Sequence, residues 1–271
     1  MLYTNINGKI LPAAEAATPA DNGAFRYGYG LFETMLVRDG SIALSEYHWE
    51  RLLSGAQQLY FEMPALLSAA RLEDEVLKLA RKNKMDELCR VRLQLYAAGG
   101  GLYGAAVQRP SYIIECFPLD EAVTGLNENG LVAGIADGLH KSADALSNLK
   151  SCNALIYAIA ARQAKQLQWN DALITNTAGH IIESTIANIF WVNEGAIYTP
   201  PLADGCVAGV MRRHILATIP GITERILTKE ILLTADEVFL TNAIKKVKWI
   251  GSIEDKKYGN NVVKSVMAAL G

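Results

Sequence analysis

Hydrophobic and polar residues alternate along several short stretches of the first half of the chain, with a period typical of β-strands. The stretch "YTNINGKIL" places Asn7-Gly8 between two alternating segments, and "ETMLVRDGSIAL" places Asp39-Gly40 in the same way. Asn-Gly and Asp-Gly favour two-residue hairpin turns because both central residues must adopt positive φ angles. The pattern therefore predicts two β-hairpins, and a third is predicted between "CRVRLQLYA" and "PSYIIECFPL".

Apolar residues recur at helical spacing in the segments between these hairpins. Ser45 is the expected N-cap of a first helix, and residues 65–83 are expected to form a second. The apolar stripe of the first helix consists of Trp49, Leu52, Leu53, Ala56, Leu59 and Tyr60. Residues 119–128 lose the periodicity, which indicates a linker between a first domain over 1–118 and a larger domain over 129–271.

The larger domain is expected to begin with a strand near 130–136 and a helix that starts at Lys150. Three strands are then expected, in "DALITNT", "HIIESTIANIFWV" and "AIYTP". A helix near Val210, a strand over 236–241 and a C-terminal helix complete the pattern. Hairpin clusters separated by helices favour an α+β fold over a parallel α/β sheet.

The composition argues against several function classes. With 26 basic and 28 acidic residues the net charge is −2, so no basic surface for nucleic acid or an anionic membrane is expected. No apolar run has the length of a membrane span, and the first residues lack the regions of a signal peptide. The four cysteines and four histidines are scattered, so we expect no disulfide framework, no metal site and a reduced, cytoplasmic setting.

Lys150 is an unusual residue because it precedes a run that is apolar on every side. Ser147 and Asn148 are good N-cap residues, which predicts that Lys150 lies in the first turn of a buried helix. The helix dipole and burial both disfavour an ammonium group there and are expected to lower the pKa of the amine. Such an amine is a nucleophile suited to a Schiff base. The alternative is a surface lysine at a helix end.

Glu183 is a lone carboxylate in a mostly apolar strand. Alternation places it on one face with Thr185, Ala187, Ile189 and Trp191. This pattern predicts a buried carboxylate held against a cation such as a protonated pyridine nitrogen. The alternative is an edge position or a bend at the end of a strand.

Four further features carry candidate chemistry. The segment "GVMRRHIL" predicts a helix start whose N–H groups can bind an anion, and Arg51 points away from the apolar stripe of its helix. The segment "GGGLYG" (99–104) precedes a strand rather than a helix, so it is interpreted as a flexible loop and not as a dinucleotide site. Arg90, Arg92, Gln94 and Tyr96 share one strand face, where Arg92 is a candidate clamp for a substrate carboxylate and surface pairing of the arginines is the alternative.

Six segments together resemble the class IV aminotransferases, the fold-type IV enzymes that depend on pyridoxal 5'-phosphate (PLP). They follow the family's order over nearly the whole chain. The segments are "RYGYGLFETMLVRDG", "HWERL", "LKSCNAL", "IIESTIANIFWV", "AGVMRRHIL" and "DEVFLTNA". The resemblance implies a small α/β domain, a linker and a larger domain built on a barrel-like sheet, with PLP between the domains and a homodimeric assembly.

The resemblance also implies a role for each candidate residue. Lys150 would form the internal aldimine with PLP and transfer the proton, and Glu183 would keep the pyridine nitrogen protonated. The candidate phosphate ligands are Arg51, Val210, Met211, Asn242 and Ala243. The candidate substrate-binding residues are Phe32, Arg92 and Tyr96.

Two reactions fit the resemblance. The first expectation is transfer of an amino group between an amino acid and a 2-oxo acid, for which Arg92 matches a strand arginine of the branched-chain enzymes. The second is a 4-amino-4-deoxychorismate lyase, which releases pyruvate and 4-aminobenzoate, and which the Lys150–Asn153 spacing and the Asn242-Ala243 pair resemble. A non-catalytic binding module with the same fold would be favoured by loss of Lys150 or Glu183, and both residues are present.

Overall fold

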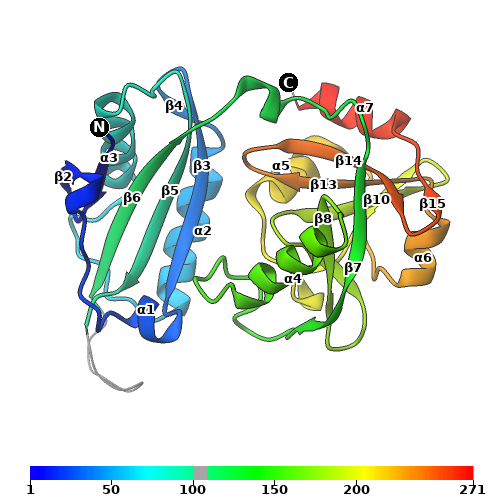
Figure 1. Cartoon of the computed structure of the whole chain (residues 1–271), viewed down its shortest axis with the longest axis horizontal. Coiled ribbons are helices and arrows are strands. Elements are labelled where there is room, and N and C mark those ends of the chain that lie inside the picture. Colours follow the sequence, from blue (N-terminus) through cyan, green and yellow to red (C-terminus); the bar gives the residue numbers. More distant parts are fainter. Residues whose placement is uncertain (100–108, 271) are drawn as a thin grey trace. The chain divides into compact units, whose positions relative to one another are not determined.

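The computed structural model describes residues 1–99 and 109–270. The chain forms two compact units (Figure 1). The first consists of Met1–Val123 together with Lys150–Asn153, and the second of Thr124–Leu149 together with Ala154–Gly271. The four residues that begin with Lys150 therefore belong to the first unit, although the chain on both sides of them belongs to the second.

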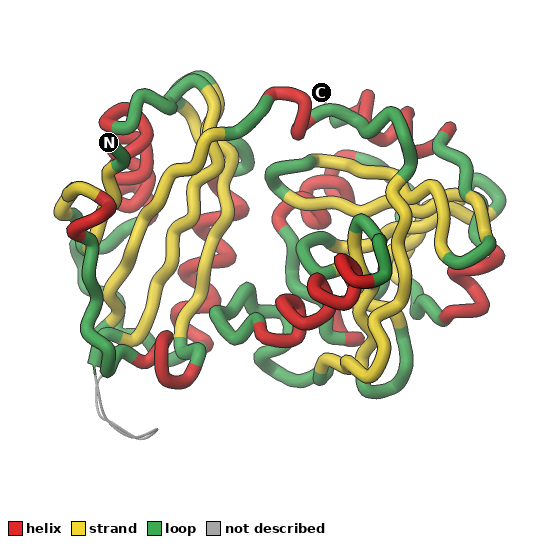
Figure 2. Tube along the Cα trace, in the orientation of Figure 1, coloured by secondary structure: helices red, strands yellow, loops and turns green. Residues whose placement is uncertain are grey.

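The first unit is built on a six-stranded antiparallel sheet in the order β2-β1-β6-β5-β3-β4. Figure 2 shows its long strands β3, β5 and β6 side by side. The strands are β1 (Tyr3–Ile6), β2 (Lys9–Pro12), β3 (Gly30–Arg38), β4 (Ser41–Ile42), β5 (Leu88–Ala97) and β6 (Pro110–Pro118). The helical segments are η1 (Ala13–Glu15), α1 (Gly23–Tyr27), α2 (Ser45–Gln58), α3 (Ala69–Lys82) and η2 (Glu121–Thr124).

The three hairpins that the sequence predicts are confirmed. Asn7 and Gly8 have φ angles of 53° and 87°, and Asp39 and Gly40 have φ angles of 49° and 70°, as turns of this type require. The turns pair β1 with β2 and β3 with β4, and β5 pairs with β6. The helix expected at Ser45 is also present, but Leu44 is its N-cap and the helix ends at Gln58, so Tyr60 lies outside it and is exposed.

Alternate residues of β3 face opposite sides of the sheet. Leu31, Glu33 and Met35 are buried on the side that α2 and α3 cover. Phe32 and Thr34 lie on the other side, directly opposite Gln94 and Arg92 of β5.

The second unit contains a closed, mixed barrel. Six strands follow one another around it in the order β10-β13-β14-β7-β8-β9, and β9 pairs again with β10. The barrel strands are β7 (Leu131–Lys141), β8 (Asp171–Asn176), β9 (Ile181–Ser184), β10 (Asn188–Asn193), β13 (Glu237–Asn242) and β14 (Lys246–Ile253). Three short strands extend the sheet, namely β11 (Ala196–Thr199), β12 (Thr223–Glu224) and β15 (Lys256–Lys257).

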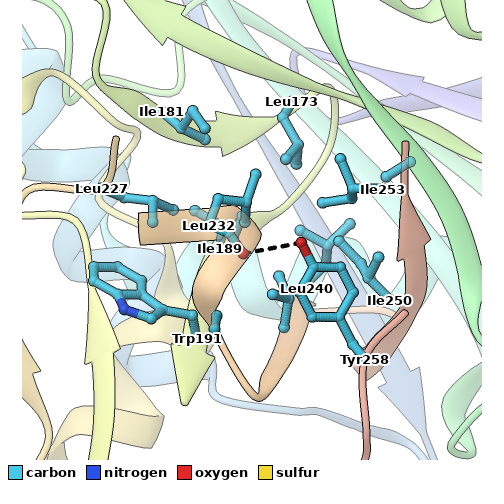
Figure 3. Close-up of a cluster of buried hydrophobic side chains, with 13 residues drawn as sticks. Leu173, Ile181, Ile189, Trp191, Leu227, Leu232, Leu240, Ile250, Ile253 and Tyr258 are labelled. Atoms are coloured by element: carbon cyan, nitrogen blue, oxygen red, sulfur yellow. Dashed lines mark hydrogen bonds between the residues drawn. The ribbon is translucent and has the colours of Figure 1, made fainter. Parts of the chain in front are cut away.

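A hydrophobic cluster forms the core of the second unit (Figure 3). Ile189 and Trp191 of β10 are fully buried in it, and the Tyr258 hydroxyl donates a hydrogen bond to the Leu232 carbonyl oxygen at 2.9 Å. The helices of this unit are α4 (Leu155–Gln166), η3 (Leu202–Asp204), α5 (Val210–Thr218), α6 (Lys229–Thr234) and α7 (Asn261–Ala269). None of the described helices is long and apolar enough to cross a membrane.

Two expectations about the second unit are wrong. The segment expected as one strand over 180–192 forms two antiparallel strands, with Asn188 opposite Glu183, so the alternation that grouped Glu183 with Ile189 and Trp191 does not exist. The turn contains no glycine or proline and includes the apolar Ile186 and Ala187, so the segment resembles one continuous strand. Helix α4 is not buried all round, because it packs through Ala160 and Ala164 while Leu155 is 70% exposed.

Candidate active site

Lys150 does not lie in a helix. The segment Lys150–Asn153 instead runs antiparallel to the edge of β3, where the Phe32 N–H donates to the Lys150 carbonyl oxygen at 2.9 Å. The Cys152 N–H donates to the Gly30 carbonyl oxygen at 2.8 Å, and α4 begins only at Leu155. The expected position in a first helical turn is therefore wrong, and with it the helix-dipole argument for the amine.

The expected cap residues are engaged elsewhere. The Asn148 amide donates to the carbonyl oxygens of Leu202 and Cys206 at 2.8 and 2.6 Å. The Ser147 hydroxyl donates to the Ser142 carbonyl oxygen at 2.8 Å. Both side chains stabilise the loop before Lys150 and neither caps a helix. Residues 150–153 therefore extend along β3, and α4 begins after them.

The Lys150 side chain lies against an aromatic ring. Its Nζ is 4.4 Å from the centroid of the Phe32 ring, and the guanidinium carbon of Arg92 is 3.8 Å from the same centroid. The face of an aromatic ring attracts cations, so Phe32 stabilises both side chains at this position. Three of the expected site residues are thus brought together, and two of them are cations.

Arg92 is held by its neighbour on the same strand. Its Nη2 donates to Gln94 Oε1 at 3.0 Å, and burial lowers the pKa of Arg92 although the nearby Cys152 and Glu115 act in the opposite direction. An arginine keeps its charge even so, and its forked donors suit a carboxylate. Tyr96 is buried, which raises the pKa of its phenol, and its hydroxyl interacts with Ser111 on β6.

Arg51 pairs with a buried carboxylate of the first unit. Its Nε and Nη2 donate to the two oxygens of Glu33 at 2.8 and 2.5 Å, and His48 Nδ1 lies 2.6 Å from Glu33 Oε2. Burial opposes ionisation of Glu33, but the charges of Arg51 and His48 and their hydrogen bonds lower the pKa of Glu33 to about 2. Arg51 therefore faces the sheet that α2 covers rather than solvent.

Sequence reasoning missed Glu33 and His48. The signal for Glu33 was available, since it is a lone carboxylate between Leu31 and Met35, as Glu183 is among apolar residues. His48 lies three residues before Arg51, which places both side chains on the same face of α2.

Glu183 is buried in the second unit and faces a cation. Its Oε1 accepts hydrogen bonds from Lys141 Nζ at 2.7 Å and from the Tyr157 hydroxyl at 2.8 Å. Its Oε2 accepts one from the Val207 N–H at 2.9 Å. A carboxylate offers about four acceptor positions, so the three donors that reach Glu183 leave room for one more.

Sequence reasoning also missed Lys141 and Tyr157. Tyr157 lies in a run that is otherwise mostly apolar, and its hydroxyl reaches Glu183. Burial, and after it the charge of Glu183, raise the pKa of Tyr157, so the hydroxyl keeps its proton and acts as a donor. Lys141 ends β7 and lies far from Glu183 in sequence, so no local pattern connects the two.

The N-terminus of α5 is a candidate anion site. Gly209 is its N-cap, no side chain caps the helix, and Val210 and Met211 are the first helical residues. The N–H groups of a first helical turn have no partner within the helix and attract anions. A Cβ atom at Gly209 would lie 1.9 Å from Asn188 Oδ1, so this approach requires glycine.

Asn242 and Ala243 lie at the turn between β13 and β14. Asn242 Oδ1 accepts hydrogen bonds from the N–H groups of Ile244 and Lys245 at 3.0 and 2.8 Å, and its amide donates to the Ile186 carbonyl oxygen at 3.2 Å. The Asn242 side chain therefore fixes this turn and, through it, the backbone of Ala243. Of the glycine-rich segment 99–104, residues 100–104 lie outside the described residues.

These groups suit a cofactor that carries an aldehyde, a protonated ring nitrogen and a phosphate. Lys150 supplies an amine, Glu183 a buried carboxylate with one acceptor position left, and α5 an uncapped N-terminus. Taken one by one, these groups match the chemical groups of PLP.

Comparison with known proteins gives a consistent result. A family model described as "Amino-transferase class IV" matches residues 30–253. An aminodeoxychorismate lyase of Bacillus subtilis is 29% identical over 268 residues, which cover 96% of this chain and 89% of that protein. A putative branched-chain-amino-acid aminotransferase of Methanocaldococcus jannaschii is 28% identical over 272 residues, which cover 98% of this chain and 92% of that protein.

A solved structure supports the same fold. The branched-chain amino acid aminotransferase of Escherichia coli superimposes with a TM-score of 0.89 at 22% identity, covering 99% of this chain and 93% of that chain. At this identity the likeness concerns the fold alone, and it confirms the expected α+β architecture with a barrel-like sheet.

Proposed function

Because the chain belongs to the class IV aminotransferase family, we propose that it is a PLP-dependent enzyme that transfers an amino group between an amino acid and a 2-oxo acid. The observation that carries this proposal is that the Lys150 amine and the Arg92 guanidinium both lie against the ring of Phe32. An amino acid and a 2-oxo acid share a carboxylate, so the same arginine can bind both substrates of such a reaction.

PLP, when bound, supplies an aldehyde that reacts with amines and a ring that withdraws electrons from the substrate. Lys150 would be the residue that binds the aldehyde carbon and that takes and returns the substrate proton. Glu183 would hold a proton on the ring nitrogen through its remaining acceptor position, while Lys141 and Tyr157 fix the orientation of its carboxylate.

The phosphate of the cofactor is assigned to charged and backbone groups. Val210 and Met211 offer N–H groups at the start of α5, and the turn of Asn242 and Ala243 completes the set. The family resemblance would add the positive charge of Arg51, whose side chain is oriented by its hydrogen bonds to Glu33. Helix N-termini and arginines are the groups that most often bind phosphate in proteins.

A second function is supported by separate observations. The relative from Bacillus subtilis is an aminodeoxychorismate lyase, and the Lys150–Asn153 spacing and the Asn242-Ala243 pair resemble lyases. In this alternative the substrate loses pyruvate and 4-aminobenzoate is formed. Lys150 would again take and return the proton, so the site residues named above serve either reaction.

We further propose a homodimer, as the family resemblance implies. Leu155 and Ile159 on the outer side of α4 are 70% and 41% exposed, which is unusual for large apolar side chains of one helix. Light scattering on the purified protein should give twice the mass of one chain. The mass of a single chain at micromolar concentration would contradict this part of the proposal.

One assay divides the two reactions. The enzyme is supplied with PLP and offered a panel of L- and D-amino acids with 2-oxoglutarate or pyruvate, and in parallel aminodeoxychorismate, with release of 4-aminobenzoate measured. We expect amino transfer to be the faster reaction and Lys150→Ala to abolish it. Release of 4-aminobenzoate without amino transfer would select the lyase, and loss of neither reaction in Lys150→Ala would reject both.

A further inference from the structure

Two glycines of the segment "YGYGLF" lie directly against the segment that carries Lys150. A Cβ atom at Gly28 would lie 3.2 Å from the Cα and Cβ atoms of Asn153 and 3.3 Å from its nitrogen. A Cβ atom at Gly30 would lie 3.1 Å from Cys152 Sγ and 2.7 Å from the Leu95 carbonyl oxygen. Both glycines therefore leave the space that Ser151–Asn153 occupies.

Phe32 holds Lys150 from two sides. Its N–H donates to the Lys150 carbonyl oxygen, and its ring lies 4.4 Å from the Lys150 amine. The second backbone hydrogen bond, from the Cys152 N–H to the Gly30 carbonyl oxygen, closes a short antiparallel bridge around Leu31 and Ser151. The position of the amine thus depends on how closely this segment approaches β3.

We propose that Gly28 and Gly30 are positioning residues for Lys150: they permit the close approach of Ser151–Asn153 to β3, and this approach sets the amine against the Phe32 ring. The role of Lys150 as the reactive amine rests on the proposed function. The positions of the two glycines and of Ser151–Asn153 do not depend on it. Any side chain at position 28 must push Asn153 away, because its Cβ meets backbone atoms that cannot rotate aside.

Gly28→Ala is the more informative variant, because Gly30→Ala would also displace β5 through Leu95. The chain offers a matched control in Gly40→Ala. Gly28 and Gly40 have φ angles of +66° and +70°, so alanine is equally strained at both, but a Cβ atom at Gly40 meets nothing within 4 Å. Any difference between the two variants therefore reports the contact of the new Cβ atom at position 28 with Asn153.

The first measurement is hydrogen exchange of the Phe32 and Cys152 amides in the cofactor-free protein. We expect exchange at both amides to be about tenfold faster in Gly28→Ala, because the bridge opens more often, and unchanged in Gly40→Ala. The second measurement is the rate at which acetic anhydride acetylates Lys150, relative to the exposed Lys165 of the same molecule. This ratio should change about threefold or more in Gly28→Ala only, since the amine has left its place on the ring.

Equal exchange and equal acetylation in the two variants would overturn the proposal. If Gly28→Ala does not fold, Gly28→Asn against Gly40→Asn repeats the comparison, because asparagine tolerates positive φ and carries the same Cβ atom. Addition of PLP to the wild-type protein then separates the two proposals. If PLP does not bind Lys150, the proposed function fails, while the two cofactor-free measurements still decide whether the glycines position this residue.

Discussion

Glu33 of the first unit and Glu183 of the second are both buried carboxylates bound to a cation, and the two differ in their other partners. Glu33 is 1% exposed and receives hydrogen bonds from Arg51 and His48, both side chains of α2. Glu183 is 3% exposed and receives them from Lys141, from the Tyr157 hydroxyl and from the Val207 N–H. A lone carboxylate in an apolar strand is therefore evidence of burial, and its neighbourhood decides what it does.

The two carboxylates also differ in the elements that surround them. Glu33 lies between a sheet and the helix that covers it, so its charge stabilises the packing of α2 and orients Arg51. Glu183 is bonded to the loop that leads into α5, three residues before the uncapped helix N-terminus. We infer that Glu33 chiefly supports the structure and that Glu183 chiefly supports the chemistry.

The largest expected effect is that of Glu183→Gln on activity. A neutral amide cannot hold a proton on the ring nitrogen, so kcat/KM should fall about 100-fold or more while PLP still binds. Glu33→Gln is the matched control, assayed with saturating PLP under conditions in which both variants are folded, and it should lose far less kcat/KM because Glu33 orients Arg51 but contacts no reacting group. Equal losses in the two variants would remove the distinction between the two carboxylates.

Glu33→Gln should have its main effect on stability. Removing this buried charge takes away the carboxylate that binds Arg51 and His48, which should cost about 3–5 kcal/mol of the free energy of unfolding. Glu121→Gln, in the exposed pair with Arg38, should cost about 1 kcal/mol or less. Urea denaturation followed by tryptophan fluorescence measures both values, and similar losses would contradict the structural role of Glu33.

The stabilisation by Glu33 should depend on pH in a defined direction. The pKa of Glu33 is lowered from 4.5 to about 2 in the folded protein, so its contribution is fully present above pH 4.5 and is lost as the pH falls to 2. The difference in unfolding free energy between the wild type and Glu33→Gln should therefore shrink across this interval. A difference that stays constant from pH 5 to pH 2 would show that ionisation of Glu33 does not matter.

Tyr157→Phe should have the smallest effect. It removes one of the three hydrogen bonds to Glu183 and leaves those of Lys141 and the Val207 N–H in place, so kcat/KM should fall only about 2- to 10-fold. Tyr258→Phe is the control, because it removes a buried hydroxyl that donates to the Leu232 carbonyl oxygen in the core. Both variants should lose similar stability, but only Tyr157→Phe should lose activity.

The sequence predicted those features that depend on neighbouring residues. The Asn7-Gly8 and Asp39-Gly40 turns follow from local backbone preference, and the start of α5 follows from Gly209. The fold class and the family followed from segments spread along the chain.

Features that depend on distant contacts were not predictable in this way. Lys150 was placed in a helix because nothing in its own segment indicates pairing with β3. Lys141 was missed as the partner of Glu183 for the same reason, since the two residues meet only when β8 pairs with both β7 and β9. The chemical importance of Lys150 was thus inferred from a helix position that is wrong, and it now rests on Phe32 and Arg92.

The central claim is that Lys150 is the amine that binds PLP. The direct measurement is to add PLP to the purified protein, reduce with borohydride, and locate the modified lysine by mass spectrometry of the peptides. We expect a yellow protein before reduction and a single modified residue, Lys150, with no modification in Lys150→Ala. A protein that stays colourless, or modification at Lys141 instead of Lys150, would contradict the account.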